Sequence, residues 1–393
     1  MRILYALNSY RPYIDGVGVS IERQALGLVA RGHEAAIVAP ALTFSDVEEE
    51  RKGIRVNRLR ALKLFADQWR IPVFPDRGLA RVLETFDPDV VVVSVPFLLS
   101  RAAWQIARDA GIPVVGITGV MPEWFSYNFG LPKSLTSVVG NQLWKLITDY
   151  YNQCDQVVGV TETALDFLRQ CGLGRPSQVI SNGVQLDRFR PRPRDTALAR
   201  KLGVPDKPTV VYAGRLDAEK RMETWIRAIP HVLRQLDAHF VIGGDGTERP
   251  ALEDLARRLG VAGHVTFPGF LDADEYERLY SLGTVFAIAS PAELQSIVTL
   301  EAAASGLPIV AVNAGALPEL CRPGANGSLF ELGDSSGMAA ALVEILSNPA
   351  LARQMGAASR RIAEAHDIEE SYRHYEELYA VVVASKAAEV PAA

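Results

Sequence analysis

Residues 285–310 read VFAIASPAELQSIVTLEAAASGLPIV and join a strand pattern directly to a helix pattern. The first five residues form an apolar run, which predicts a buried strand that ends at Ser290-Pro291. Glu293 follows this end, and Glu301 comes eight residues later within an apolar helix pattern. A buried strand that passes straight into a helix is typical of parallel α/β sheets. The segment therefore predicts a doubly wound α/β fold.

The two carboxylates suit a ligand with two sets of hydroxyl groups, because an ionised carboxylate can accept two hydrogen bonds from a diol. Four backbone amides are expected at the helix N-terminus, those of Leu294, Gln295, Ser296 and Ile297. Amides at such a position attract phosphate. The alternative interpretation makes Glu293 a capping acid and Glu301 a solvated helix residue.

Composition indicates a globular protein with room for two domain cores, because 48% of its 393 residues are hydrophobic. A formal net charge of −5 argues against nucleic acid as the main partner. The 3 cysteines have no C-x-x-C spacing, which favours reduced thiols and no zinc site. Residues 1–7 are too short for a signal peptide, and no apolar run reaches the length of a membrane span. We therefore expect a cytoplasmic protein.

Short β-rich runs alternate with longer helical patterns along the whole chain, which predicts parallel sheets covered by helices. The helical patterns at 19–31 and 101–110 end at glycines. The expected strands are residues 3–7, 35–39, 54–59, 90–95, 114–117, 156–160, 178–180, 209–213, 240–242, 265–267, 285–289, 309–312 and 328–330.

The stretch FRPRPR, residues 189–194, is expected to link two domains, because alternating prolines fit neither a helix nor a β-ladder. We expect a first Rossmann-like domain at 1–190 and a second at 191–365. Residues 366–393 are expected to return to the first domain as an amphipathic helix and to end in a short tail. Ligands bind at the carboxyl ends of strands in such sheets, so a central cleft faced by both domains is the expected site.

Two cations follow the expected strand 209–213, in a loop that leads to a helix. Arg215 and Lys220 lie five residues apart there. Cations at a strand end can neutralise a diphosphate, on which charge builds as a sugar leaves. A solvated basic loop is the alternative.

Glycines mark other strand ends, where backbone can approach a ligand closely. Gly16 and Gly18 follow the first strand, Gly244 follows strand 240–242, and Phe270 comes directly after a Pro-Gly pair. A plain structural turn explains any one of them equally well.

Together these segments resemble the retaining glycosyltransferases of family 4, which have the GT-B fold of two doubly wound domains. The resemblance covers the whole chain, with its motifs in the family's order. These are DGVG (15–18), SNGVQLDRF (181–189), GRLDAEK (214–220), GGDG (243–246), FPGF (267–270), and the E-x(7)-E pair at 293 and 301 with ASGLP (304–308) after it.

The resemblance implies a role for each matching position. Arg215 and Lys220 hold the donor diphosphate, while Glu293 and the amides after it hold hydroxyls of the sugar. Glu301 takes the ribose hydroxyls, and the backbone around Phe270 faces the base. The loop with Asp15, Gly16 and Gly18 closes over sugar and phosphate.

The implied reaction moves a sugar from a UDP- or GDP-sugar to a lipid-linked or small hydroxyl acceptor, with retention of configuration. No cofactor beyond the nucleotide sugar is implied, and no metal ion. Asp272 and Asp274 have the D-x-D spacing of metal-dependent enzymes, but they directly precede a helix, where capping explains them.

The chain departs from the family pattern at two positions. Gly119 stands where similar enzymes carry a histidine beside the reacting sugar, and Ser296 stands where they usually have glycine. A side chain at 296 would crowd the donor. Glu123, or Asp15, is a candidate for the histidine's role, since a carboxylate can orient an acceptor hydroxyl or support developing positive charge.

Basic and apolar residues interleave in the first domain and suit an anionic bilayer surface. They are Arg51, Lys52, Arg55, Arg58, Arg60, Lys63 and Arg70, with Leu62, Leu64, Phe65 and Trp69. The stretches 121–125 and 131–144 extend this apolar character. The functional interpretation is a glycolipid acceptor at the inner face of a membrane; ordinary solvated arginines are the alternative.

Three other functions remain open on the sequence alone. The chain is alternatively a nucleotide-sugar-binding protein with weakened catalysis, or a sugar-nucleotide epimerase of the same fold. A nicotinamide dehydrogenase fits less well, because the first strand-turn-helix lacks the required glycine spacing and acid. Nothing in the sequence defines an oligomeric state.

Overall fold

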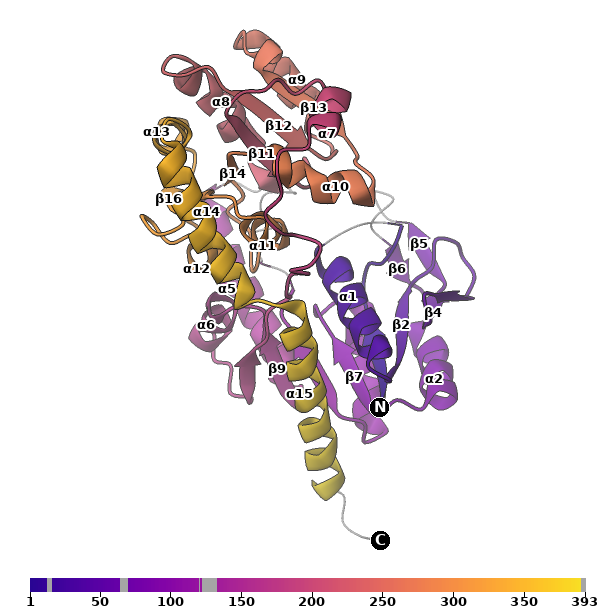
Figure 1. Cartoon of the computed structure of the whole chain (residues 1–393). Helices are drawn as coiled ribbons and strands as arrows, with labels where there is room; N and C mark the ends of the chain where they lie inside the picture. The colour runs from indigo at the N-terminus through magenta and orange to yellow at the C-terminus, as the bar shows by residue number, and fades with distance from the viewer. Residues whose placement is uncertain (13–15, 64–69, 120, 122–132, 390–393) are drawn as a thin grey trace. The chain divides into compact units, whose positions relative to one another are not determined.

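The computed structural model describes residues 1–12, 16–63, 70–119, 121 and 133–389 (Figure 1). The described chain forms two compact units. The first contains the residues up to Asn182 together with those from Glu369 onward, and the second is Gly183–Ile368. Each unit is built on its own sheet.

The sheet of the first unit has eight strands in the order β10-β9-β8-β7-β1-β2-β4-β3, parallel throughout except for the antiparallel pair β3–β4. In chain order the strands are β1 (Arg2–Ala6), β2 (Glu34–Pro40), β3 (Val47–Arg51), β4 (Ile54–Leu59), β7 (Val90–Val93), β8 (Val114–Ile117), β9 (Gln156–Gly159) and β10 (Ser177–Val179). A separate two-stranded hairpin is formed by β5 (Ala61–Lys63) and β6 (Arg70–Pro72). The helices of this part of the chain are α1 (Gly16–Ala30), α2 (Pro75–Phe86), α3 (Leu98–Asp109), α5 (Lys133–Tyr151), α6 (Glu162–Gln170) and α15 (Ile368–Glu389).

The second unit has a six-stranded, fully parallel sheet in the order β13-β12-β11-β14-β15-β16. Its strands are β11 (Thr209–Ala213), β12 (His239–Gly243), β13 (Val265–Gly269), β14 (Val285–Ile288), β15 (Ile309–Val312) and β16 (Gly327–Phe330). Its α-helices are α7 (Thr196–Leu202), α8 (Met222–Leu233), α9 (Arg249–Arg258), α10 (Ala273–Leu279), α11 (Ile297–Ala304), α12 (Leu317–Leu320), α13 (Ser335–Leu346) and α14 (Pro349–Glu364). Short 3-10 turns form η1 (Ala218–Lys220), η2 (Ala262–His264) and η3 (Tyr280–Leu282).

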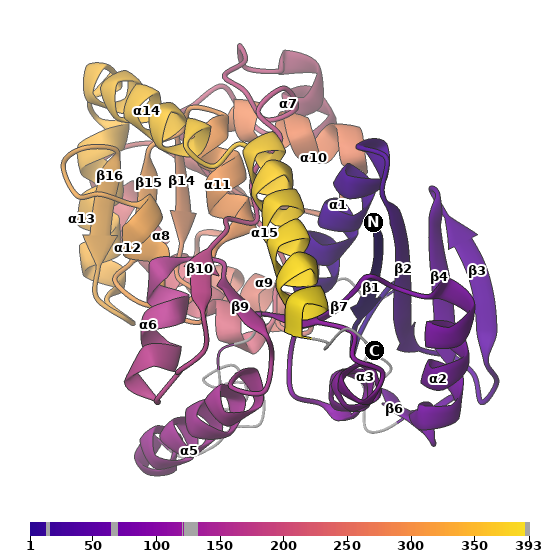
Figure 2. The same ribbon diagram turned by 90° about the horizontal axis from the view of Figure 1, so that it is seen from below.

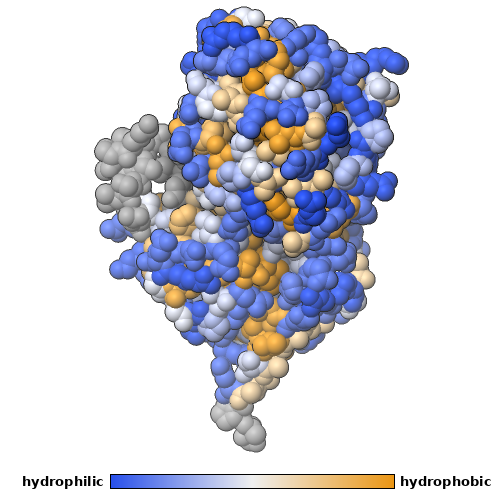
Figure 3. Space-filling view, turned by 60° about the vertical axis from the view of Figure 1, so that its left-hand side comes forward, coloured by the Kyte–Doolittle hydropathy of each residue, from blue (hydrophilic) through white to orange (hydrophobic). Residues whose placement is uncertain are grey.

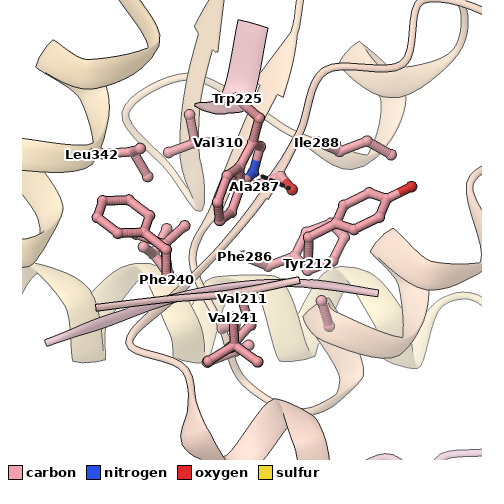
Figure 4. Close-up of a cluster of buried hydrophobic side chains, with 14 of the residues drawn as sticks. Val211, Tyr212, Trp225, Phe240, Val241, Phe286, Ala287, Ile288, Val310 and Leu342 are labelled. Carbon is pink, nitrogen blue, oxygen red and sulfur yellow. Dashed lines mark hydrogen bonds between the residues drawn. The ribbon is translucent and has the colours of Figure 1, made fainter. Parts of the chain in front are cut away.

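Continuous apolar runs explain why these strands are central. Every residue of β7, β11, β14 and β15 is buried, as expected for parallel strands covered on both faces. Figure 4 shows the core of the second unit, where Trp225 packs edge-on against Phe240. The indole nitrogen of Trp225 donates to the Ala287 carbonyl at 3.3 Å, so the largest core side chain has a polar partner.

All of the expected strands are present, with ends within two residues of the predicted bounds. The prediction missed β3, β5 and β6. β3 reads VEEER and is mainly exposed, so it lacks the apolar alternation that marks a strand. β5 and β6 have three residues each, too short to produce a pattern.

Helix α15 packs within the first unit, beside α1 (Figures 1 and 2). The ring of Tyr372 occupies the space where a Cβ of Gly27 would stand, so a glycine is needed at that contact. Arg31 and His33 bond the Glu376 carboxylate at 2.6 and 2.8 Å. The residues before α15 belong to the second unit, so the chain passes between the units twice.

Two further features of the described residues concern membrane-spanning helices and disulfide bonds. None of these helices combines the length and apolar character needed to cross a membrane. Cys154, Cys171 and Cys321 are free thiols. The face drawn in Figure 3 is mainly hydrophilic, with apolar side chains gathered in patches.

Candidate active site

The candidate site lies where the strand order of the second sheet reverses. From β11 the chain goes to β12 and β13 on one side, whereas β14 pairs with the other side of β11. Ligands bind at such a switch point, beyond the carboxyl ends of the strands. Arg215 and Lys220 follow β11, and Glu293 follows β14. The topology thus places the predicted cations and the first predicted carboxylate at neighbouring strand ends.

Lys220 and Glu293 form an ion pair in this place. The Lys220 Nζ lies 2.8 Å from Glu293 Oε1, and the two side chains are only 17% and 12% exposed. Lys220 closes the 3-10 turn η1, and Glu293 lies in the connection between β14 and α11. The interpretation of Glu293 as a simple helix-capping acid is wrong, because its carboxylate bonds a lysine from another loop.

Arg215 is held by carboxylates of its own loop. Its guanidinium pairs with Asp217 and, at 2.6 Å, with Glu219, which is fully buried. Tyr212 donates from its hydroxyl to the Arg215 carbonyl at 3.1 Å. Burial, reinforced by the nearby Glu293 carboxylate, raises the pKa of Tyr212 well above its ordinary value, so the hydroxyl stays protonated. The basic loop is therefore an ordered ion-pair network and not a solvated basic segment.

Glu301 lies inside α11 and is 1% exposed, which overturns its interpretation as a solvated helix residue. Its Oε2 accepts hydrogen bonds from the hydroxyls of Tyr276 at 2.7 Å and Tyr280 at 3.1 Å. A buried carboxylate needs such donors.

The helix after Glu293 begins later than predicted. Ser296 is the N-cap of α11, and its hydroxyl accepts from the Thr299 amide at 3.3 Å. Serine favours this position because its oxygen satisfies an otherwise unpaired helix amide. The amides of Leu294 and Gln295 therefore precede the helix, and only that of Ile297 belongs to its first turn.

The hydroxyl of Ser296 is committed to the helix end. It accepts from the Thr299 hydroxyl at 2.8 Å as well as from its amide, and Ser296 is 2% exposed. The expectation that the Ser296 side chain crowds a donor stays a prediction, for a hydroxyl that is buried and bonded to Thr299.

Glycines let backbone segments meet at this edge of the sheet. Gly244 has φ 129°, and a Cβ there would collide with the Gly214 carbonyl oxygen. A Cβ added to Gly315, in the loop after β15, would lie 2.6 Å from the Glu293 carbonyl oxygen. The amide of Ala316 donates to that same oxygen at 2.9 Å, so the loop after β15 fixes the Glu293 backbone.

The remaining predicted site residues are dispersed. Phe270 follows β13 and is 76% exposed. Gly16 and Gly18 belong to the first unit, where they lie in the first turn of α1 and not in a loop. Asp15 and Glu123 lie outside the described residues.

Gly119 follows β8 in the first unit. A Cβ at this position would approach the Cγ2 of Val17 to 2.8 Å, closer than normal packing allows. The position at which the family carries a histidine is therefore closely packed against α1 in this chain.

Most of the predicted basic surface of the first unit is neutralised. Four of its arginines pair with carboxylates: Arg51 with Glu22, Arg55 with Glu48, Arg58 with Glu49 and Arg60 with Asp46. Leu64, Phe65 and Trp69 lie outside the described residues, as do residues 122–132.

Asp272 is the N-cap of α10 and accepts from the amides of Asp274 and Glu275 at 3.0 and 2.9 Å. Asp274 in turn pairs with Arg278 at 2.7 Å. The capping interpretation of Asp272 is thus confirmed. Within the described ranges, no group of three or more His, Cys, Asp or Glu side chains has the arrangement of a metal site.

Comparison with known proteins identifies the family of this chain. Residues 14–188 match the family described as "Glycosyltransferase Family 4", and residues 207–348 match "Glycosyl transferases group 1". A relative from Mycolicibacterium smegmatis, named GDP-mannose-dependent alpha-(1-6)-phosphatidylinositol monomannoside mannosyltransferase, is 33% identical over 376 residues, which cover 92% of this chain and 93% of the relative. This chain belongs to glycosyltransferase family 4. The resemblance drawn from the motifs is confirmed, and the protein is a glycosyltransferase.

This glycosyltransferase is also similar to a second curated relative and to a solved structure. A Mycobacterium tuberculosis protein named GDP-mannose-dependent alpha-mannosyltransferase is 28% identical over 339 residues, 85% of either chain. The solved structure of HepE from Anabaena in complex with UDP-glucose matches with a TM-score of 0.77 and 20% identity, over 97% of this chain and 100% of that one. The fold is GT-B, with two Rossmann-like units, as the motifs predicted.

Several residues of the candidate site were not singled out from the sequence. Tyr276 and Tyr280 stand one helical turn apart, a spacing that brings two side chains together but is common in any helix. Glu219 lies four residues after Arg215 and was visible only as an ordinary i, i+4 pair. Gly315 carries no local sign of its contact, because the contact is with a distant loop.

Proposed function

We propose that this glycosyltransferase moves a hexose from a nucleoside diphosphate sugar to a hydroxyl of a lipid-linked acceptor. The observation that carries the proposal is the cluster at the β11–β14 switch point, where two cations and Glu293 share one sheet edge. GDP-mannose is the first donor to test, because two relatives are named as GDP-mannose-dependent. A UDP-sugar comes second, since the similar Anabaena structure holds UDP-glucose.

Charge balance suggests how the donor would enter. Lys220 is paired with Glu293, and Arg215 is paired with Asp217 and Glu219. A diphosphate carries more negative charge than one carboxylate and would replace Glu293 as the partner of Lys220. Glu293 would then accept hydrogen bonds from hydroxyls of the sugar.

The same two cations would favour the reaction itself. As the bond between the anomeric carbon and the phosphate oxygen breaks, negative charge accumulates on the diphosphate, and fixed positive charges stabilise it. Arg215 and Lys220 would supply what a metal ion supplies in other enzymes, so we propose a metal-independent reaction. Ribose would bind at Glu301, and the base near Phe270.

Retention of configuration is proposed from the family resemblance. The acceptor oxygen would attack the face from which the diphosphate departs, and the leaving phosphate would take the acceptor proton. Glu123 or Asp15 would support the positive charge of the sugar in place of the absent histidine. If Glu123→Gln left turnover unchanged while Glu293→Gln abolished it, Glu123 would have no such role.

The acceptor side of the proposal uses the hairpin β5–β6 of the first unit. Leu62 pairs across the hairpin with Ile71, and Lys63 pairs with Arg70. Leu62 and Ile71 are both exposed. An apolar pair beside two cations suits the surface of an anionic bilayer, so we place the enzyme at the inner face of a membrane. Ser substitutions at Leu62 and Ile71 should abolish co-sedimentation with phosphatidylinositol vesicles; unchanged sedimentation would exclude the hairpin.

The decisive experiment has two stages. Thermal unfolding is first measured with GDP-mannose, UDP-glucose, GDP and UDP in the presence of EDTA. A ligand at 100 times its dissociation constant adds about 2.7 kcal/mol to the free energy of unfolding. The donor found is then incubated with phosphatidylinositol vesicles, and a glycolipid product is sought by mass spectrometry.

Each outcome of this experiment has a clear meaning. A glycolipid whose new linkage has the donor's anomeric configuration by NMR supports the proposal, and inversion would refute retention. Donor binding without transfer to any acceptor would favour a nucleotide-sugar-binding protein with weakened catalysis. The glycine at position 119, in place of the family's histidine, suggests this alternative. Conversion of the donor without an acceptor would favour an epimerase.

A further inference from the structure

Glu301 is contacted by two tyrosine hydroxyls that converge on the same carboxylate oxygen. Tyr276 donates to Oε2 at 2.7 Å and Tyr280 donates to Oε2 at 3.1 Å. The two hydroxyl oxygens lie 3.3 Å from each other. One edge of the carboxylate is therefore anchored by protein donors.

The two tyrosine rings are themselves held in place. Phe189 packs edge-on against Tyr276, with ring centroids 6.3 Å apart, and against Tyr280 at 5.8 Å. Phe189 is buried, and its carbonyl accepts from Arg360 at 2.9 Å. The tyrosine hydroxyls thus have little freedom to follow a moving carboxylate.

The Tyr280 hydroxyl is suited to donate. Burial, with smaller contributions from Tyr276 and Glu301, raises the pKa of Tyr280 well above its ordinary value, so its proton stays on the oxygen. Hydrogen bonds from a hydroxyl to a carboxylate are charge-assisted and stronger than neutral ones. Two of them on one oxygen favour one orientation of the Glu301 carboxylate.

We propose that Tyr276 and Tyr280 are positioning residues that orient Glu301 toward the 2′- and 3′-hydroxyls of the donor ribose, and that Tyr276 thereby sets selectivity for ribonucleotides over 2′-deoxyribonucleotides. This inference rests on the proposed function, in which Glu301 takes the ribose. A carboxylate fixed before the ligand arrives loses less conformational freedom on binding. Losing the Tyr276 hydroxyl therefore weakens the ribose contact without removing it.

The test is a cycle between the protein hydroxyl and the ribose hydroxyl. Dissociation constants of GDP, UDP and their 2′-deoxy forms are measured by calorimetry for the full-length wild type, Tyr276→Phe and Glu301→Gln. In the wild type we expect the tighter of GDP and UDP to bind at least about tenfold better than its deoxy form, as for a hydroxyl bonded to a charged group. Tyr276→Phe should reduce this ratio about threefold or more, with a smaller loss of affinity for the deoxy form, which keeps the 3′-hydroxyl, and Glu301→Gln should bring the ratio close to one.

Tyr379→Phe is the matched control. Tyr379 is a buried tyrosine of the first unit whose hydroxyl bonds Gln24 at 3.4 Å, so its loss removes a buried hydroxyl from the unit that does not contain Glu301. Its ribose-to-deoxyribose ratio should equal that of the wild type. Thermal unfolding of each variant shows that it is folded.

The possible failures are distinguishable. If Glu301→Gln removes the selectivity and Tyr276→Phe does not, the positioning role is refuted while the donor proposal stands. If Glu301→Gln lowers only the melting temperature and keeps the ratio, Glu301 is a structural carboxylate and the inference is wrong. If neither GDP nor UDP binds the wild type, the proposed function fails and the inference fails with it.

Discussion

At the scale of single residues, the pair Lys220–Glu293 is the contact with the most direct consequence. Removing one partner of a buried ion pair leaves an uncompensated charge, at a cost of about 3–5 kcal/mol. With the N–O distance at 2.8 Å and some exposure of both side chains, we expect Lys220→Met and Glu293→Gln each to cost about 2–3 kcal/mol of unfolding free energy. The double variant should lose less than the sum, with a coupling of about 1–3 kcal/mol by urea unfolding at pH 7.

A second ion pair of the same unit is the control for this cycle. Lys207 lies 2.6 Å from Asp237, but both side chains are exposed, at 38% and 61%. Exposed pairs contribute little to stability, so Lys207→Met should change the unfolding curve only slightly. Strictly additive effects at Lys220 and Glu293 would show that their pair does not form in solution.

Gly119 makes a prediction about the family's histidine position. Because a Cβ there would lie 2.8 Å from Val17 Cγ2, Gly119→His should overpack this contact and cost about 1–3 kcal/mol. Gly119→His combined with Val17→Ala should recover part of that loss. Thermal unfolding of the single and double variants measures both effects, and a histidine tolerated without loss would show that the contact with α1 yields easily.

At the scale of elements, α10 depends on its cap. Asp272 satisfies two amides at the start of this helix, which carries Tyr276. Asp272→Ala should lower the free energy of unfolding by about 1 kcal/mol, whereas Asp272→Asn, which can still cap, should stay close to the wild type. Melting temperatures with and without EDTA separate capping from metal binding. An Asp272→Asn variant as unstable as Asp272→Ala would contradict the capping role.

At the scale of the whole molecule, the return of α15 to the first unit makes the free energy of unfolding depend on pH. Burial tends to raise the pKa of Glu376, but its bonds to His33 and Arg31 outweigh burial, and its pKa lies below the ordinary value. A lowered pKa contributes stability above the unfolded-state pKa, and this contribution is lost as the pH falls through the folded-state pKa. Glu376→Gln should therefore cost about 1 kcal/mol at pH 7. The difference from the wild type should shrink as the pH falls below about 4.3, the ordinary pKa of glutamate, and vanish once the pH is below the folded-state pKa.

Glu377 provides the control for this pH effect. It is the next residue of α15, but its partner Arg373 belongs to the same helix and both side chains are exposed. Glu377→Gln should change stability little at either pH. Urea unfolding at pH 7 and near pH 3.5 decides the comparison, and an equal loss at both pH values for Glu376→Gln would exclude the ion-pair explanation.

Sequence patterns determined much of this protein by themselves. The central strands are continuous apolar runs such as VVVV in β7 and TVVYA in β11, and burial on both faces of a parallel sheet needs nothing more specific. The sequence also predicted membership of family 4. Arg215, Lys220 and Glu293 follow strand ends, and Glu301 lies in a helix eight residues after Glu293. These features are local, and a local pattern can be recognised in the sequence without knowledge of the fold.

Only the tertiary structure decided which partners these residues have. The bond of Lys220 to Glu293 spans 73 positions, and that of Tyr276 to Glu301 spans 25, distances along the chain at which no periodicity links two residues. The burial of Glu301, the contact of Gly315 with the Glu293 backbone and the tight packing at Gly119 all arise from segments brought together by the sheets. Helix α11 starts at Ile297 because Ser296 caps it. Several polar residues nearby could have served as the cap, and only the folded backbone shows which one does.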